Sequence, residues 1–164
     1  MAQPPTFTST EFRSALGMFA TGVTIVTAQT SEGELIGLTA NSFNSVSLEP
    51  PLVLWSLGKR SANMASFSTG SHYAINILGS HQIDLANRFA SRVENRFADV
   101  AFTPGAAGAP LLNGTAATFE CFNRSQYEEG DHVIFVGEVE RCSYNNQVSP
   151  LLYHGGKFYT EHPL

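Results

Sequence analysis

Short apolar runs, rich in β-branched and aromatic residues, recur along this chain at intervals of roughly ten residues. Clusters of Gly, Pro, Asn and Ser separate them, and few stretches show helical spacing. The pattern predicts strands at 22–28, 35–40, 51–57 and 72–78, with further strands after residue 115. This order favours a closed antiparallel barrel with a few helices over alternating strand and helix units. A Rossmann domain is excluded, because no GxGxxG motif follows any of these strands.

Composition narrows the possible functions. A chain of 164 residues can bury one sizeable core, so we predict a single domain over 1–164 with a disordered start to about residue 8. Its net charge of −5 argues against nucleic acid or an anionic membrane as the main partner. The first ten residues lack the features of a signal peptide, and no apolar run is long enough to span a membrane, so we expect a cytoplasmic protein. Cys121 and Cys142 show no metal-ligand spacing, and we expect no metal.

Three helical segments are predicted. Thr8 and Glu11 form a capping-box pattern ahead of the first. A short helix or loop should start near Ser61, and Ser80 should cap a helix over 81–90. If that last helix continued, Arg88, Arg92 and Arg96 would share one edge, and we interpret the latter two as solvated charges.

The segment 37–57, GLTANSFNSVSLEPPLVLWSL, concentrates small hydroxyl and amide side chains just before an apolar strand. Such side chains offer donors and acceptors to the edge of a planar ligand and leave nearby backbone N–H groups accessible. They also form turns that satisfy their own backbone. Spacing alone leaves both interpretations open.

Several segments in order resemble the short-chain flavin reductases of two-component flavoprotein monooxygenases. They are FRSALGMFATGVTIVTA, GLTANSFNSVSLEPPLVLWSL, SANMASF, YAINIL, LANRFA, GDHVIFVGEVE and LLYHGGKFY. The resemblance covers about 12–159 and implies an FMN-binding split barrel of six antiparallel strands in Greek-key order. It also implies a homodimer with the flavin near the subunit interface. Members reduce FMN or FAD with NADH or NADPH and release the reduced flavin to a partner oxygenase.

The resemblance also implies roles for individual residues. The flavin ring and ribityl chain would be bound by Thr39, Ala40, Asn41, Ser42, Ser45 and Val46, followed by the strand end at Ser56 and Leu57. The flavin phosphate would meet Ser61, Ala62 and Asn63, with Arg88 as a phosphate or nucleotide contact and Phe89 packing against the cofactor. The nicotinamide side would be formed by Asp131, His132, His154, Gly155 and Tyr159, with His132 as the catalytic residue.

Each of these segments also has a purely structural interpretation. Ser61 could cap a helix, the 130–132 triplet could be an ordinary hairpin turn, and the glycines at 155 and 156 make a tight turn in either case. Two other functions remain open for the same fold. One is a flavin-binding protein without catalysis, and the other is an enzyme similar to pyridoxamine-phosphate oxidase. The sequence does not distinguish FMN from FAD or NADH from NADPH, and it does not identify the partner oxygenase.

Overall fold

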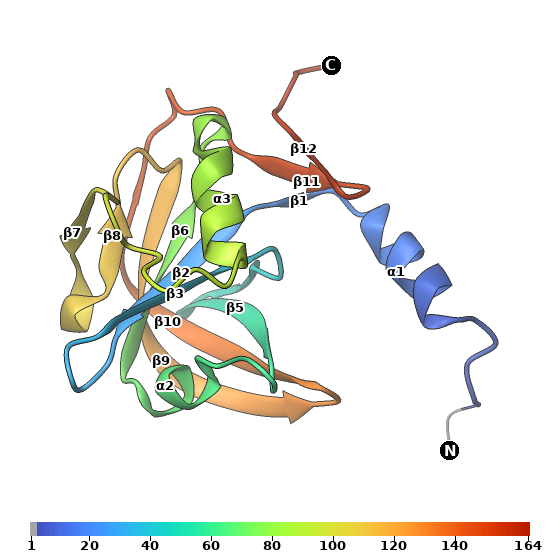
Figure 1. The fold of residues 1–164 in the computed structure, drawn as a ribbon, viewed down its shortest axis with the longest axis horizontal. Helices are drawn as coiled ribbons and strands as arrows, with labels where there is room; N and C mark the ends of the chain where they lie inside the picture. The colour runs from blue at the N-terminus through green and yellow to red at the C-terminus, as the bar shows by residue number, and fades with distance from the viewer. Residues whose placement is uncertain (1–2) are drawn as a thin grey trace.

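The computed structural model describes residues 3–164 and is mainly β (Figure 1). Seven strands form one sheet in the order β3-β2-β6-β9-β10-β5-β4, and every neighbouring pair is antiparallel. They are β2 (Thr24–Gln29), β3 (Leu35–Ala40), β4 (Asn44–Leu48), β5 (Pro51–Gly58), β6 (His72–Ile77), β9 (Ala117–Glu129) and β10 (His132–Tyr144). The prediction of an antiparallel, mainly β fold is confirmed, with seven strands in this sheet where six were expected.

Apolar alternation decides which face of β5 turns inward. Val53, Trp55 and Leu57 are buried, whereas the residues between them are partly exposed. Trp55 pairs with Phe135 on β10, and their rings stack with centroids 4.8 Å apart. Burial of a large apolar side chain contributes about 1.5–3 kcal/mol, so this face holds the sheet to its core.

The sheet curls around that core. Val26 on β2 and Trp55 on β5 belong to one cluster of buried side chains, although β2 is second in the sheet and β5 is sixth. Ile75, Cys121 and Phe135 on the strands between them belong to the same cluster, and Figure 1 shows the sheet strongly twisted and bent rather than flat. Within the described residues β3 and β4 remain the two edges, because 41–43 leaves β3 without pairing it to β4. The closed barrel expected from strand spacing is not found among the described residues.

A second core lies where α3 (Ile83–Ala90) packs on the sheet, after the short helix η1 (Ser80–Gln82). The buried Asn76 donates its side-chain amide to the Ile25 carbonyl (3.0 Å) and accepts the Leu112 backbone N–H (2.9 Å). These bonds attach β8 (Pro110–Leu112) to the sheet. The connection predicted for this region also contains β7 (Phe102–Pro104) and η2 (Ala106–Gly108).

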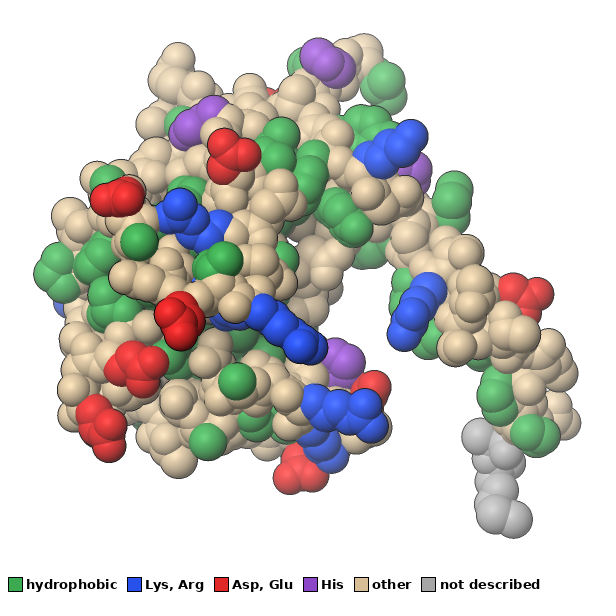
Figure 2. Space-filling view, in the orientation of Figure 1, with side chains coloured by type: hydrophobic (Ala, Val, Ile, Leu, Met, Phe, Trp, Pro, Cys, Tyr) green, Lys and Arg blue, Asp and Glu red, His purple; other side chains and the backbone are tan. Residues whose placement is uncertain are grey.

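The first helix, α1 (Ser9–Gly17), begins with the predicted capping box. The Thr8 backbone N–H donates to the Glu11 carboxylate at 2.7 Å, and the Glu11 N–H donates to the Thr8 hydroxyl at 3.2 Å. The helix buries none of its residues, and it stands away from the sheet as an arm (Figure 1). Figure 2 shows hydrophobic side chains along this arm.

A small sheet joins the arm to the body. It has the order β1-β11-β12 and consists of β1 (Thr21–Gly22), β11 (Leu152–His154) and β12 (Lys157–Tyr159). The Gly155 N–H also donates to the Gly17 carbonyl at 2.9 Å. The end of α1 is thus held beside the β11–β12 hairpin.

Several local predictions differ from the structure. The polar segment contains the strand β4, because Asn44–Leu48 pairs with β5 despite lacking an apolar alternation. The Gln82 side chain, and not that of Ser80, bonds the backbone ahead of η1. The short helix α2 (Met64–Thr69) begins three residues after Ser61.

Two further predictions concern the chain start and membrane insertion. Of the predicted disordered start, residues 1–2 lie outside the described residues, and 3–7 contains no helix or strand. No helix formed by 3–164 is long and apolar enough to span a membrane.

Candidate functional site

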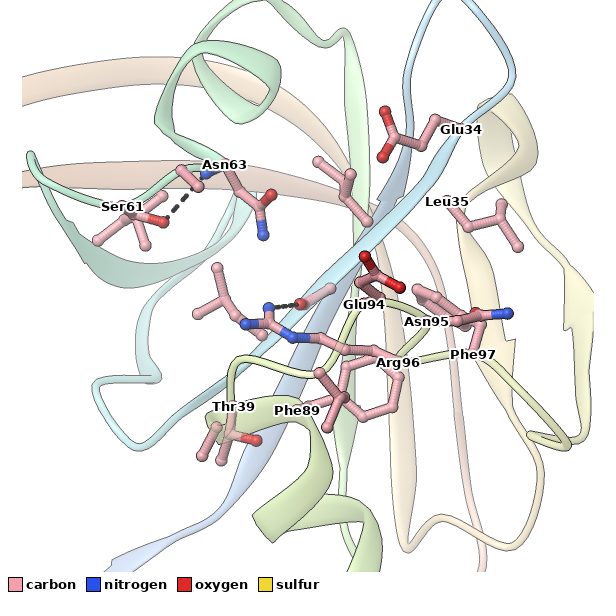
Figure 3. Close-up of a pocket in the computed structure, with 17 residues that line it drawn as sticks. Glu34, Leu35, Thr39, Ser61, Asn63, Phe89, Glu94, Asn95, Arg96 and Phe97 are labelled. Carbon is pink, nitrogen blue, oxygen red and sulfur yellow. Dashed lines mark hydrogen bonds between the residues drawn. The ribbon is translucent and has the colours of Figure 1, made fainter.

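An open cavity of about 680 Å³ lies beside β3, between the segment that precedes α2 and the segment that follows α3 (Figure 3). Leu57 and Phe89 give it apolar walls, whereas Ser61, Asn63 and Arg96 supply hydrogen-bonding groups. Cavities of this size and mixed lining are typical of sites for cofactors. Six residues expected to contact a flavin line it: Thr39, Leu57, Ser61, Ala62, Asn63 and Phe89.

Part of the polar stretch serves the fold itself. The Thr39 hydroxyl donates to the Ala86 carbonyl at 2.7 Å and so joins β3 to α3. The Ser42 hydroxyl accepts the Ser56 N–H at 2.9 Å and donates to the Ser56 carbonyl at 3.2 Å. Both hydroxyl protons are therefore engaged, which leaves the oxygen of Thr39 as an acceptor for a ligand.

The remaining members of the stretch are accessible. Asn41, Ser45 and Val46 are exposed, and no side-chain hydrogen bond links them to the rest of the described chain. Neither Ser45 nor Val46 lines the cavities described here; both lie on the edge strand β4. Their predicted contact with the flavin stays a prediction.

The segment before α2 forms a tight local turn. The Ser61 hydroxyl accepts the Asn63 N–H at 3.2 Å, and Asn63 occupies the N-cap position without a side-chain capping bond. At the other end of this helix, the Asn123 side chain donates to the carbonyls of Phe67 (2.8 Å) and Gly70 (2.9 Å). The strand β9 thus fixes the C-terminal part of α2, and Ser61 and Asn63 line the cavity ahead of the helix.

A second cavity, of about 370 Å³, adjoins the first and shares Thr39 and Ala90 with it. It runs toward the β11–β12 hairpin. Sequence reasoning found Ala40 and Asn41 in its lining but missed residues from the hairpin and from α3, because nothing in their spacing marks them. The missed residues include Asn87, Tyr153 and Phe158, whereas Gly156 belongs to the glycine turn that the sequence did single out.

The hairpin presents its two faces differently. Tyr153 and Phe158 pair across it and line the second cavity, with ring centroids 5.4 Å apart. Because side chains alternate along a strand, His154 and Tyr159 point to the opposite face. Their rings lie 6.1 Å apart, outside the cavity lining. Gly155 is placed beside the end of α1 by its bond to Gly17. The predicted nicotinamide contacts of His154, Gly155 and Tyr159 stay predictions.

His132 occupies a third hollow, of about 420 Å³, with Gly58, Lys59, Arg60 and Asp131. The His132 Nδ1 lies 2.7 Å from an Asp131 carboxylate oxygen. This hydrogen bond, and then the charge of His132, lower the pKa of the exposed Asp131 carboxyl. The carboxylate thus orients the ring, which leaves Nε2 for other contacts.

His132 and the polar strand β4 both pair with β5, so their separation can be estimated along that strand. His132 pairs with Gly58, and Asn44 pairs with Leu54, four residues earlier on the same strand. Four residues span about 13 Å. His132 therefore lies apart from the β4 end of the polar stretch, whereas Ser42 bonds the backbone of Ser56, only two residues before Gly58.

Arg88 and Arg96 lie differently from what the sequence predicted. Arg88 donates to the Ala98 carbonyl and does not line either of the first two cavities. Arg96, interpreted as a solvated charge on an extended helix, lines the first cavity instead. The helix ends at Ala90, as predicted, and the Ser91 hydroxyl donates to the Arg88 carbonyl at 2.7 Å just after it.

The lining suits an amphipathic planar ligand with an anionic end. Apolar walls favour an aromatic ring, and the serine, asparagine and arginine groups favour a phosphate. Within 3–164 no group of three or more His, Cys, Asp or Glu side chains is placed to hold a metal ion.

Comparisons with known proteins agree with this chemistry. Residues 16–162 match the family described as flavin reductase like domain. The chain is 47% identical over 150 residues to the FMN reductase (NADH) SmoA of Agrobacterium fabrum, a match that covers 92% of this chain and 84% of that protein. It is 41% identical to the reductase component of the flavin-dependent trigonelline monooxygenase of Acinetobacter baylyi, covering 92% of this chain. The chain spans only 48% of that relative's length.

Solved structures show the same fold. The NADH:FAD oxidoreductase SgcE6 of Streptomyces globisporus C-1027, in complex with NAD and FAD fragments, superimposes with a TM-score of 0.89 at 39% identity. That match covers 94% of this chain and 93% of the other. The flavin reductase PheA2 gives a TM-score of 0.88 at 36% identity, covering 96% of this chain and all (100%) of that one.

Proposed function

The chain belongs to the flavin reductase-like family, and on that basis we propose that it reduces a flavin, FMN or FAD, with NADH and supplies the reduced flavin to a partner monooxygenase. NADH is favoured as donor because relatives are named as NADH-dependent, among them the FMN reductase (NADH) of A. fabrum and an NADH:FMN oxidoreductase of Rhodococcus erythropolis. The reductase components of monooxygenases among the relatives support the partner.

One observation carries the proposal. Two cavities adjoin along β3 and share Thr39 and Ala90 in their linings. Two ligands could therefore bind side by side. The first offers Ser61, Asn63 and apolar walls, as a flavin nucleotide requires. The second is lined by aromatic rings from the β11–β12 hairpin, which suit a second planar ring.

The protein contributes to the reaction by positioning the two ligands. When both ligands are bound, hydride passes from the nicotinamide to the flavin, and this chemistry belongs to the ligands. Phe89 and Leu57 would hold one ring by apolar contact, and Thr39 lies at the junction of the two cavities. The small side chain of Ala90 at that junction leaves room for close approach of the rings. The third hollow, where Asp131 orients His132, shares no lining residue with the second cavity, so a role of His132 on the nicotinamide side is proposed from the resemblance alone.

A steady-state assay tests the proposal against its alternatives. Purified protein is mixed with NADH and a catalytic amount of free FMN or FAD in air, and NADH absorbance is followed. Continued oxidation of NADH that requires added flavin supports the reductase. A protein that stays yellow without oxidising NADH would be a flavin carrier, and oxidation of pyridoxamine phosphate without NADH would select the oxidase-like activity.

The finer description of the fold is also a proposal. We infer a split barrel with Greek-key order, supported by the curled seven-stranded sheet with two free edges. A single domain is supported by strand β2, which contributes side chains to both cores, and by α3, which contacts β2 and β3. Limited proteolysis that removes only the arm and leaves one protected fragment would agree with a single domain.

A homodimer is proposed from the exposed apolar surface. Phe12, Leu16 and Phe19 on or next to α1 are 50%, 57% and 78% exposed, and Leu48 on β4 is 91% exposed. An amphipathic helix that buries nothing against its own chain requires another surface. A second copy is the expected occupant, as the resemblance to dimeric reductases implies. Sedimentation at micromolar concentration should show a dimer, and a monomer would exclude this arrangement.

A further inference from the structure

Arg96 is fixed in the first cavity by backbone carbonyls from two distant parts of the chain. After α3 ends at Ala90, the chain turns back along the cavity. Arg96 Nη1 donates to the Gly37 carbonyl on β3 at 2.7 Å. Its Nε and Nη2 donate to the Ser91 carbonyl at 3.2 and 2.6 Å. The guanidinium is therefore held in one orientation.

These bonds do not exhaust its donors. A guanidinium carries five N–H groups, and the three bonds leave one N–H free on each terminal nitrogen. In Figure 3 the guanidinium extends into the cavity toward the side that carries Ser61 and Asn63. Two free donors on adjacent nitrogens form the fork that binds two oxygens of a phosphate.

The charge of Arg96 has no partner in the described chain. No carboxylate lies within ion-pair distance of it, although Glu34 and Glu94 also line the cavity. Both glutamates are exposed, whereas Arg96 is partly buried. A partly buried cation without a counter-ion is stabilised when an anion enters beside it.

We propose that Arg96 binds the phosphate of the flavin nucleotide, together with the Ser61 hydroxyl and the Asn63 amide across the cavity. This inference rests on the proposed function, since it takes the ligand to be a flavin. It makes Arg96 the residue that favours a phosphorylated flavin over riboflavin, which shares the ring and lacks the phosphate. The orientation of the fork comes from the Gly37 and Ser91 carbonyls.

The test compares two ligands and two arginines. Dissociation constants of FMN and riboflavin are measured by flavin fluorescence for the unaltered protein, Arg96→Gln and Arg92→Gln. Arg92 is the matched control, because it lies four residues away, is exposed and does not line the cavity. Arg96→Gln should weaken FMN binding at least tenfold, about 1.4 kcal/mol, and change riboflavin binding less than threefold. Arg92→Gln should change neither constant beyond threefold.

Two results would overturn the proposal. Equal weakening of both flavins would mean that Arg96 only holds the loop, and unchanged FMN binding would mean that its free donors meet no phosphate. Arg96→Lys is a control for loss of the loop structure in Arg96→Gln. It keeps the positive charge without the two-pronged donor geometry, so it should bind FMN more tightly than Arg96→Gln does. These are binding measurements, so a protein that binds FMN but never oxidises NADH would refute the proposed function and leave this inference intact.

Discussion

Gly37 is the position where a single added methyl group should disturb both the fold and the site. A Cβ there would lie 2.8 Å from Phe89 Cε1 and 3.2 Å from Phe97 Cζ. The Phe89 ring is 1% exposed and packs edge-on against Phe97, with ring centroids 4.9 Å apart, so neither ring can move freely. Overpacking of this kind costs about 1–3 kcal/mol. Replacing Gly by Ala also lowers the conformational entropy of the unfolded chain, which stabilises the folded state by about 0.4–1 kcal/mol.

Gly37→Ala should therefore lower the free energy of unfolding by about 0–2.6 kcal/mol relative to the unaltered protein, measured by urea denaturation without ligand. Both rings line the first cavity, so FMN affinity should fall as well. Gly22→Ala is the matched control, because a Cβ at that strand position meets no atom within 4 Å. If Gly37→Ala unfolds at the same urea concentration as Gly22→Ala, the close packing inferred around β3 is incorrect.

Three other predictions concern the nicotinamide side, the phosphate and the thiols. His132→Ala should slow flavin reduction by NADH about ten- to a hundredfold, or raise the Michaelis constant for NADH, with flavin affinity within about threefold; stopped-flow rates equal to wild type would make His132 a turn residue. Ser61→Asp should raise the FMN dissociation constant at least tenfold, about 1.4 kcal/mol, by charge repulsion. The ligand-free protein should keep its stability, because a carboxylate can still accept the Asn63 N–H. Burial, and then Glu140 and Glu120, raise the pKa of the Cys121 thiol from 9.0 to about 12. A thiol reagent at pH 8 should therefore modify the exposed Cys142 and spare Cys121 until unfolding. Because the unfolded thiol ionises first, this contribution to stability is complete below pH 9 and is lost as pH rises toward 12, so the urea midpoint should fall in that range.

The main hairpins could be predicted because their information is local. The β2–β3 and β9–β10 pairs join apolar runs through short turns, and the turn before β10 contains Gly130 with a positive φ of 58°. In contrast, β4 consists largely of small polar residues and becomes a strand through its pairing with β5. The spacing of residues in the sequence does not show that this segment pairs with β5.

The candidate site divides in the same way. The roles of Ser61 and Phe89 were implied by the resemblance to flavin reductases, and the structure brings both residues to one cavity. Arg96 was interpreted as a solvated charge. Its actual position could not be predicted, because it depends on a hydrogen bond to the Gly37 carbonyl, 59 residues away in the chain. Tyr153 and Phe158 were missed in favour of their neighbours His154 and Tyr159, because a strand pattern does not say which face meets a ligand.

Reduction of bound flavin by NADH tests the central claim most directly. Protein with one equivalent of FMN is mixed without oxygen with NADH, or with NADH deuterated at the transferring position of C4, and flavin absorbance is followed by stopped flow. The account predicts loss of the oxidised flavin band at a rate that saturates with NADH and is slower with the deuterated donor. Flavin that remains oxidised at saturating NADH, in a protein that binds both ligands, would contradict it.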